Sequence, residues 1–329
     1  MYLASDLLAP ADPSRRRHPK ATQTSSDKAF QGGVAVAASI TLLIIGLIAF
    51  FLFWRAYDAL SSAGLSFFTT SQWFPETGHF GVVAVILGTV LIAAVALISS
   101  VPIAIGCSLY ISEYAPRSLR KLMISLIDLM AAVPSIVYGL WGLGFLQPAI
   151  IPTSRWISDH FSFIPFLRVD QANYASSTFI AGMVVGIMVI PIASSVMREV
   201  FSQAPPSERE GAYALGSTRW GMVRSVVLPF GRAGMVGGIM LGLGRALGET
   251  IAVVLIISII FDPAVLVRVL EGNGASISAL IALRYSEASE FGLSALMAAG
   301  LVLFLITLLV NTLAAMIVRR SRSGVGTEI

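Results

Sequence analysis

Two opposite charges lie inside a long apolar stretch in the last third of the chain. Arg245 and Glu249 follow three glycines that repeat every four residues, Gly234, Gly238 and Gly242. At about 100° per residue, one stripe of a helix would hold the last two glycines and both charges. The glycines would let a neighbouring helix approach closely. Arg245 would lie about 16 Å along the helix from the first glycine, near the middle of a bilayer.

Such charges need compensation, because each costs about 3 kcal/mol or more on a lipid-facing helix. One interpretation is an ion pair between Arg245 and Glu249 that only fixes helix packing. The other is a site on the path of a transported anion, where Arg245 attracts the anion and Glu249 prevents it from binding too tightly. We favour the translocation site, since permeation needs binding that is weak enough to release.

Two further polar residues occur at membrane depth. Asp128 follows Lys121 by about 10 Å of helix rise. It is either a buried, hydrogen-bonded group near the headgroups or a partner for Arg245 or for an arginine of another subunit. Ser135 stands next to Pro134, which predicts a kink or a broken turn, and its hydroxyl could bind an anion, as could that of Tyr138.

The composition predicts an all-α polytopic membrane protein. Of 329 residues, 56% are hydrophobic and 12% are charged, whereas soluble domains carry about 25% charged residues. The net charge of +4 comes from short basic segments beside apolar stretches, which indicates topology and not nucleic-acid binding. The single cysteine, Cys107, and three dispersed histidines predict no metal site, and no catalytic residues are expected.

Six apolar stretches are long enough to cross about 30 Å of hydrocarbon. They are Val34–Trp54, Val82–Tyr110, Leu122–Leu146, Thr178–Val196, Met235–Ile260 and Leu293–Val318. The lysines and arginines are about threefold more abundant on one side, which predicts that both termini are cytoplasmic. We therefore expect a flexible basic tail (1–33), a six-helix domain (34–318) with a cytoplasmic loop at 197–233, and a C-terminal tail (319–329), in a multi-pass protein of the cytoplasmic membrane.

Two predicted outer segments are rich in apolar residues. Arg55–Phe80 is aromatic, and Phe261–Phe291 has apolar residues at helical spacing. Both are expected to form helices that lie on the bilayer surface or contact another protein.

The loop between the fourth and fifth stretches predicts a helix–turn–helix. Glu210 lies on the first helix, Gly216 permits a sharp turn, and Trp220–Val227 begins the second helix. Pro229 and Gly231 are expected to separate this second helix from the following span. A short helix on the cytoplasmic face can fit a groove of a soluble partner.

This loop resembles the E-A-A-x3-G-x9-I-x-L-P motif of ABC-importer permeases. The matching positions are Glu210, Ala212, Gly216, Leu228 and Pro229, while Gly211 and Val226 depart from it. Gly211 could loosen the first helix by about 1 kcal/mol without removing the docking face. The chain has no Gly-Lys-Ser/Thr phosphate-binding loop. The resemblance therefore implies a type I importer permease fold whose ATP and Mg²⁺ bind a separate ATPase, with no cofactor on this chain.

Three more segments make the resemblance specific to one family of importer permeases. Residues 244–250 and 132–143, with the outer segment 71–75, are similar to the PstC-type permeases of phosphate importers, and the likeness covers about 34–318. It implies that Arg245 and Glu249 are transport residues. It also implies phosphate as cargo, a second PstA-like permease, two copies of a PstB-like ATPase and an external PstS-like binding protein.

Two rival functions stay open on the sequence. The Arg245 site would recognise the charge of an oxyanion more than its chemical identity. Molybdate, sulfate or phosphonate could therefore be the cargo instead of phosphate. An ion-coupled secondary anion transporter would work without ATP, but it leaves the spacing of residues 210–229 unexplained.

Overall fold

A computed structural model describes residues 25–259, 261, 267–272 and 274–322, and these are mostly helical. The chain divides into two units, residues 1–50 and 51–329. The described part of the first unit belongs to helix α1 (Ser25–Ala63). The helix begins at Ser25, so residues 25–33 of the predicted flexible tail are helical. Residues 1–24 of that tail lie outside the described residues, as do 323–329 of the C-terminal tail.

Six helical segments of the described chain are long and apolar enough to cross a membrane, as predicted. They are Ser25–Phe68, Val83–Tyr114, Ser135–Phe161, Thr178–Ser202, Arg219–Gly248 and Glu290–Met316. Five of them each contain more than half of the corresponding predicted stretch. The third is displaced toward the C-terminus, because the predicted stretch Leu122–Leu146 is not one helix.

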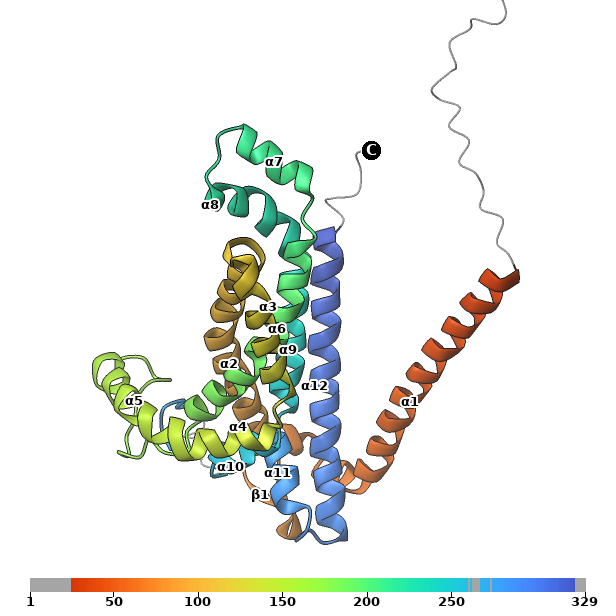
Figure 1. Ribbon diagram of the computed structural model, residues 1–329. Helices are drawn as coiled ribbons and strands as arrows, with labels where there is room; N and C mark the ends of the chain where they lie inside the picture. Colours follow the sequence, from red (N-terminus) through yellow and green to blue (C-terminus); the bar gives the residue numbers. More distant parts are fainter. Residues whose placement is uncertain (1–24, 260, 262–266, 273, 323–329) are drawn as a thin grey trace, which may run out of the picture. The chain divides into compact units, whose positions relative to one another are not determined.

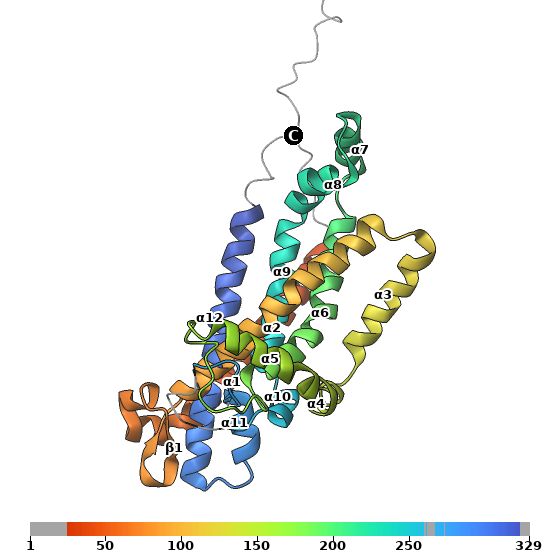
Figure 2. The ribbon, with the colours of Figure 1, turned by 90° about the vertical axis from the view of Figure 1, so that its left-hand side faces the viewer.

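The core of the second unit is built from α2 (Val83–Leu109), α6 (Thr178–Ser202) and α9 (Leu228–Gly248). Helix α6 packs against both of the others, and α12 (Glu290–Arg322) lies along α9 (Figures 1 and 2). The glycine stripe of α9 faces α6, as its spacing predicts. A Cβ atom at Gly242 would lie 2.5 Å from Cγ1 of Val189, and one at Gly238 would lie 2.9 Å from the carbonyl oxygen of Ala193.

The chain breaks at Pro134, between α3 (Arg117–Ala132) and α4 (Ser135–Trp141). Val133 is extended, with ψ 129°, because a residue before proline is excluded from the helical region. Helix α3 is about 24 Å long and packs on α6. A wide π turn (Gly142–Leu146) joins α4 to α5 (Gln147–Phe161), and this continuous segment runs crosswise to the bundle (Figure 1).

A second break ends α9 at Gly248, so the predicted span Met235–Ile260 is also not one helix. Glu249 is extended, with ψ 126°, and the short helix α10 (Ile251–Ile256) follows. Helix α4 packs on α10. The contact is close, because a Cβ atom at Gly139 would lie 2.9 Å from Cα of Ala252. Ile260, the predicted end of this span, lies outside the described residues.

The two predicted outer segments fold differently from the expectation. In 55–80, a 3-10 turn (Gly64–Phe68) precedes a hairpin of β1 (Trp73–Phe74) and β2 (His79–Phe80), with a 3-10 turn (Pro75–Thr77) between the strands. The Phe80 ring is buried and contacts three aromatic rings edge-on, those of Phe67, Trp73 and Phe291. Hydrophobic burial therefore replaces the expected surface helix.

The second outer segment is helical only in part. Helix α11 (Ile277–Arg284) buries Ile277 and Leu280 in the core, so it does not lie flat on a surface. Leu266, which belongs to the predicted helical pattern, lies outside the described residues.

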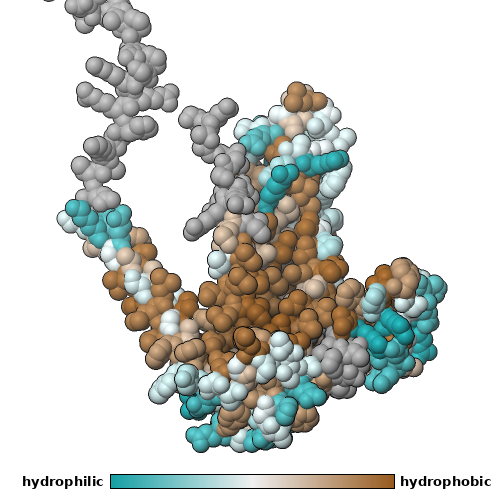
Figure 3. Space-filling view, turned by 180° about the vertical axis from the view of Figure 1, so that it is seen from behind, coloured by the Kyte–Doolittle hydropathy of each residue, from teal (hydrophilic) through white to brown (hydrophobic). Residues whose placement is uncertain are grey.

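A broad hydrophobic zone crosses the middle of the second unit, with hydrophilic side chains at both ends (Figure 3). Exposed large apolar side chains come from several helices and include Ile98, Leu126, Leu129, Leu241, Leu308 and Leu309. A soluble protein would bury such a zone, so this surface is suited to lipid or to another membrane subunit.

Candidate functional site

The helix–turn–helix forms as predicted at one end of the bundle (Figure 1). Helix α7 (Pro206–Ala214) ends before Gly216, whose φ of 83° is in the left-handed region that favours glycine. The Thr218 side chain then accepts a 3.1 Å hydrogen bond from the Gly221 amide and starts α8 (Arg219–Met222). The turn therefore fixes the direction of two short helices.

The second helix does not end at Pro229, which corrects the prediction. A π turn (Val223–Val227) links α8 to α9, so one helical segment runs from Arg219 to Gly248. Pro229 occupies the first turn of α9. Proline lacks an amide donor and crowds the preceding turn, and a wide turn relieves both problems without breaking the helix.

The six predicted docking residues fall into two groups. Glu210, Gly211, Gly216 and Pro229 are exposed, whereas the other two are half-buried against the core. Ala212 and Leu228, which form this second group, therefore attach the loop to the bundle.

The most exposed apolar side chains of the loop were not predicted. Leu215 is 89% exposed, Trp220 is 56% exposed and Tyr213 is 45% exposed. Large apolar residues at the tip of a polar loop are a sequence signal for a contact surface. The loop thus presents an apolar tip on a short, well-fixed scaffold.

Arg245 and Glu249 do not form the ion pair that a continuous helix would allow. Arg245 lies in the last turn of α9, whereas Glu249 is already outside the helix. The two residues are therefore not related as i and i+4 of one helix. The described ion pairs of the chain involve other residues, namely Arg168, Arg209, Arg268 and Arg284 with their acidic partners.

Glu249 stabilises the break between α9 and α10. Its side chain is buried and accepts a 3.3 Å hydrogen bond from the Ala252 amide, in the first turn of α10. Its main-chain carbonyl accepts a 2.8 Å hydrogen bond from the Ser278 hydroxyl of α11. A carboxylate at a helix N-terminus interacts favourably with the unpaired amides there. Ser278 was not identified from the sequence.

Arg245 is left without a partner in the described part of the chain. Its Nε is buried and makes no hydrogen bond. Its charge acts on Tyr138 of α4, and Ser135 lies one turn earlier on that helix and is half-buried. The Tyr138 hydroxyl donates a 2.8 Å hydrogen bond to the Met130 carbonyl across the Pro134 break. The structure therefore brings α4 and Arg245 together.

Asp128 is not in this group. It is exposed on α3, which packs on α6 and has no buried residue. Within this chain alone, Asp128 is therefore not the buried group of the first interpretation. An exposed carboxylate at this depth is compatible with a partner on another subunit.

Among the described residues, no three histidine, cysteine or acidic side chains are close enough to hold a metal ion. The described chain offers instead an exposed helical loop at one end and, next to the break that ends α9, a half-buried guanidinium that has no partner among the described residues.

Comparison with known proteins gives a family match. Residues 100–323 match the family described as binding-protein-dependent transport system inner membrane component. The phosphate transport system permease protein PstC of Xylella fastidiosa is 39% identical over 295 residues, covering 87% of this chain and 90% of the relative. The PstC protein of Mesorhizobium japonicum is 37% identical over 312 residues, covering 92% of each chain.

Solved structures show the same fold at low sequence identity. A bacterial ABC transporter that imports the acidic polysaccharide alginate aligns with a TM-score of 0.54 at 17% identity, covering 89% of this chain and 99% of the other. The inward-facing MetNI methionine ABC transporter aligns with a TM-score of 0.51 at 15% identity, covering 72% and 95%.

Proposed function

Because the chain belongs to the binding-protein-dependent transport inner membrane component family, and within it to the PstC phosphate permeases, we propose that it carries inorganic phosphate into the cell as one permease subunit of an ATP-driven importer. The protein is a multi-pass inner membrane protein with the type I ABC permease fold. It acts as a transport subunit and not as an enzyme.

The α7–α8 end faces the cytoplasm in this proposal, together with both termini. The excess of lysine and arginine in the segments at that end supports this orientation. The exposed tip of Tyr213, Leu215 and Trp220 docks in a groove of a PstB-like ATPase dimer. ATP and Mg²⁺ bind to that partner.

Two further partners complete the importer. A PstA-like permease covers the exposed apolar faces and completes the pore, and a PstS-like binding protein delivers phosphate at the opposite end. The names of the relatives support this assembly as that of a phosphate transport system.

The unpaired guanidinium of Arg245 is the observation that carries phosphate transport. A half-buried positive charge whose Nε is buried without a hydrogen-bond partner is partly desolvated, and an anion that occupies the site reduces this cost. The Glu249 side chain is engaged with the Ala252 amide and forms no ion pair with Arg245, so the guanidinium is free to bind an anion. In this proposal the hydroxyls of Ser135 and Tyr138 on α4 add contacts to the anion, the latter by giving up its hydrogen bond to the Met130 carbonyl. Asp128 would act only through the second permease.

Transport then follows from alternating exposure of this site. Closure of the ATPase dimer moves the docked α7–α8 loop, and the helices tilt from an inward-open to an outward-open arrangement. Phosphate enters from the outside, meets Arg245 and leaves to the cytoplasm when the helices return. A bound anion exchanges readily in this proposal, because Arg245 holds it without an ion-pair network around the site.

The test is uptake of labelled phosphate in proteoliposomes that contain the whole complex. Arg245→Gln should reduce uptake by at least about tenfold, the loss expected when one desolvated charge contact is removed. Arg245→Lys, which keeps the charge, should retain part of it. Arg117→Gln removes an exposed arginine of α3 and should transport normally.

Two results would overturn the proposal. The first is normal uptake by Arg245→Gln in a complex that is fully assembled. The second is uptake that continues with a hydrolysis-dead ATPase, which would indicate an ion-coupled transporter. Competition by molybdate or sulfate as effective as by phosphate would reassign the cargo but keep the importer.

A further inference from the structure

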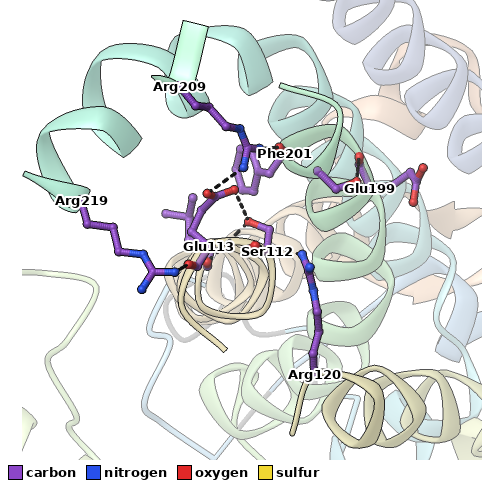
Figure 4. A network of polar contacts seen from close by, with 9 residues as sticks. Ser112, Glu113, Arg120, Glu199, Phe201, Arg209 and Arg219 are labelled. Atoms are coloured by element: carbon purple, nitrogen blue, oxygen red, sulfur yellow. Dashed lines mark hydrogen bonds and ion pairs between the residues drawn. The ribbon is translucent and has the colours of Figure 1, made fainter. Parts of the chain in front are cut away.

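A buried carboxylate lies where the α7–α8 loop meets the body of the protein. Glu113 is in the π turn (Tyr110–Tyr114) that ends α2, four residues before α3 begins, and it is only 6% exposed. Figure 4 shows that Arg209 of α7 and Arg219 of α8 both point toward this turn. A carboxylate buried to this degree has to be paired.

An arginine of α7 supplies the charge partner. Nη1 of Arg209 lies 3.0 Å from Oε2 of Glu113, and Nη2 of the same guanidinium donates a 2.7 Å hydrogen bond to the Phe201 carbonyl of α6. The Ser112 hydroxyl donates to Oε1 of Glu113 at 3.1 Å. Arg209 therefore ties α7 to the ends of α2 and α6 at once.

An arginine of α8 contacts the same turn. Arg219 donates a hydrogen bond to the main-chain carbonyl of Glu113, and its guanidinium lies 4.8 Å from the centre of the Tyr114 ring. On the other side, Nη2 of Arg120 in α3 donates a 2.8 Å hydrogen bond to the Ser112 carbonyl. Helices α7, α8 and α3 therefore all make hydrogen bonds to the π turn that contains Glu113.

These contacts are the charged connection between the loop and the α2–α3 turn. Helix α7 otherwise packs mainly on α8 and on the π turn that follows it. Charge-assisted hydrogen bonds in a partly buried network are stronger and more directional than apolar contacts. An apolar contact could slide when the loop is displaced, whereas this network resists sliding.

We propose that Glu113 is a positioning residue for energy coupling, which makes the α7–α8 loop and the α2–α3 turn move as one body. Resting on the function proposed above, this assigns a route for the movement: it passes from the docked loop through Glu113 to α3, and so to the Pro134 break beside Arg245. Glu113 contacts neither the ATPase groove nor the transported anion. Its effect is on how much of the ATPase movement reaches the transport site.

The test is the number of phosphate ions transported per ATP hydrolysed, measured in proteoliposomes with the complete complex. Glu113→Gln keeps the shape and an acceptor oxygen but removes the charge. We expect the complex to assemble and to hydrolyse ATP within about twofold of the wild-type rate, while phosphate per ATP falls by about tenfold. A role limited to stability would lower hydrolysis and transport together and leave their ratio unchanged.

Glu199→Gln is the matched control, because it makes the same chemical change on an exposed glutamate whose described contact is with Gln203 of the same helical end. It should leave the ratio unchanged. Arg209→Gln should lower the ratio as Glu113→Gln does, and the double variant should be no worse than either single variant, since both break one contact. Arg209→Lys should keep an intermediate ratio.

Two outcomes would overturn the inference: an unchanged ratio in Glu113→Gln, or fully additive effects in the double variant. If Glu113→Gln does not reach the membrane, phosphate transported per ATP is measured in Arg209→Gln and Arg209→Lys instead. An unchanged value in Arg209→Gln would then overturn the inference. Failure of the proposed function itself is distinguishable, because the wild-type complex would then show no ATP-dependent phosphate uptake at all.

Discussion

The Ser278 hydroxyl donates a 2.8 Å hydrogen bond to the main-chain carbonyl of Glu249, across 29 residues of sequence. The carbonyl belongs to the residue directly after α9, so it has no partner within a helix. Ser278 is itself buried at the start of α11. The helix break beside Arg245 is therefore held by a residue from a different element.

Removal of this contact should loosen the break. Ser278→Ala leaves a buried carbonyl unsatisfied, which costs about 1–3 kcal/mol, and should lower both the thermal stability of the purified protein and phosphate uptake. Ser278→Thr keeps the hydroxyl and should be milder in both measurements. Equal behaviour of the two variants would show that the hydroxyl is not what holds the break.

The contact between α6 and α9 can be tested with two adjacent glycines. Gly238→Ala places a Cβ atom 2.9 Å from the Ala193 carbonyl oxygen, and such overpacking should cost about 1–3 kcal/mol. Gly237 has open space at the same position, so Gly237→Ala should be neutral or stabilising by up to about 1 kcal/mol. Melting temperatures in detergent should separate the two variants, and a similar effect of both would contradict the close packing.

The turn of the docking loop offers a second glycine pair. Gly216→Ala forces a left-handed φ of 83° on alanine, at a cost of about 1–2 kcal/mol, and should reduce co-purification of the ATPase. Gly211→Ala lies within α7 with open space around it. It should strengthen the helix and leave co-purification unchanged. Loss of the ATPase from Gly211→Ala would mean that Gly211 itself is part of the contact.

A cluster of charges at the other end of the bundle should respond to pH. The hydrogen bond from Arg168 holds the pKa of the Asp170 carboxyl below its ordinary value near 3.8, and the charge of Arg268 acts in the same direction. Arg268 lies 2.5 Å from Asp170 and 2.9 Å from Glu271, so the cluster joins two segments that are distant in sequence.

Because its pKa is lowered in the folded chain, Asp170 stabilises the fold more at neutral pH than at acidic pH. The contribution of Asp170 to stability is complete above the pKa of the unfolded chain and is lost as the pH falls through the lower pKa of the folded chain. The melting temperatures of wild type and Asp170→Asn should therefore differ at neutral pH and converge at acidic pH. Asp159→Asn, an exposed aspartate of α5, should show no such convergence. A constant difference across the pH range would rule out titration of Asp170 as the cause.

The hydrophobic pattern predicts most of the fold, because long apolar stretches have few alternatives in a membrane. It misplaces the third span and the end of the fifth, because an apolar run does not reveal where a helix stops within it. Pro134 carries a local signal for its break. Glu249 does not, since its extended conformation depends on Ser278 and Ala252, which are contacts made only after folding.

The candidate site, like the fold, can be predicted from the sequence only in part. The position of Arg245 at membrane depth follows from its sequence neighbours, but its lack of a partner could not be predicted, because it depends on Glu249 leaving the helix. Glu113 was not identified either. A single glutamate beside a tyrosine and a proline carries no motif, and its two arginine partners, Arg209 and Arg219, lie about a hundred residues away in sequence.

One helical segment runs from Arg219 to Gly248. It connects the exposed docking loop directly to the candidate anion site. Trp220 at its exposed end and Arg245 at its buried end share one axis. A rotation of that axis at the docking surface would therefore reach the guanidinium along α9 as well, beside the movement that passes through Glu113 and α3. For a side chain about 6 Å from the axis, each 10° of torsion moves the charge sideways by about 1 Å, which is enough to make or lose a hydrogen bond to an anion.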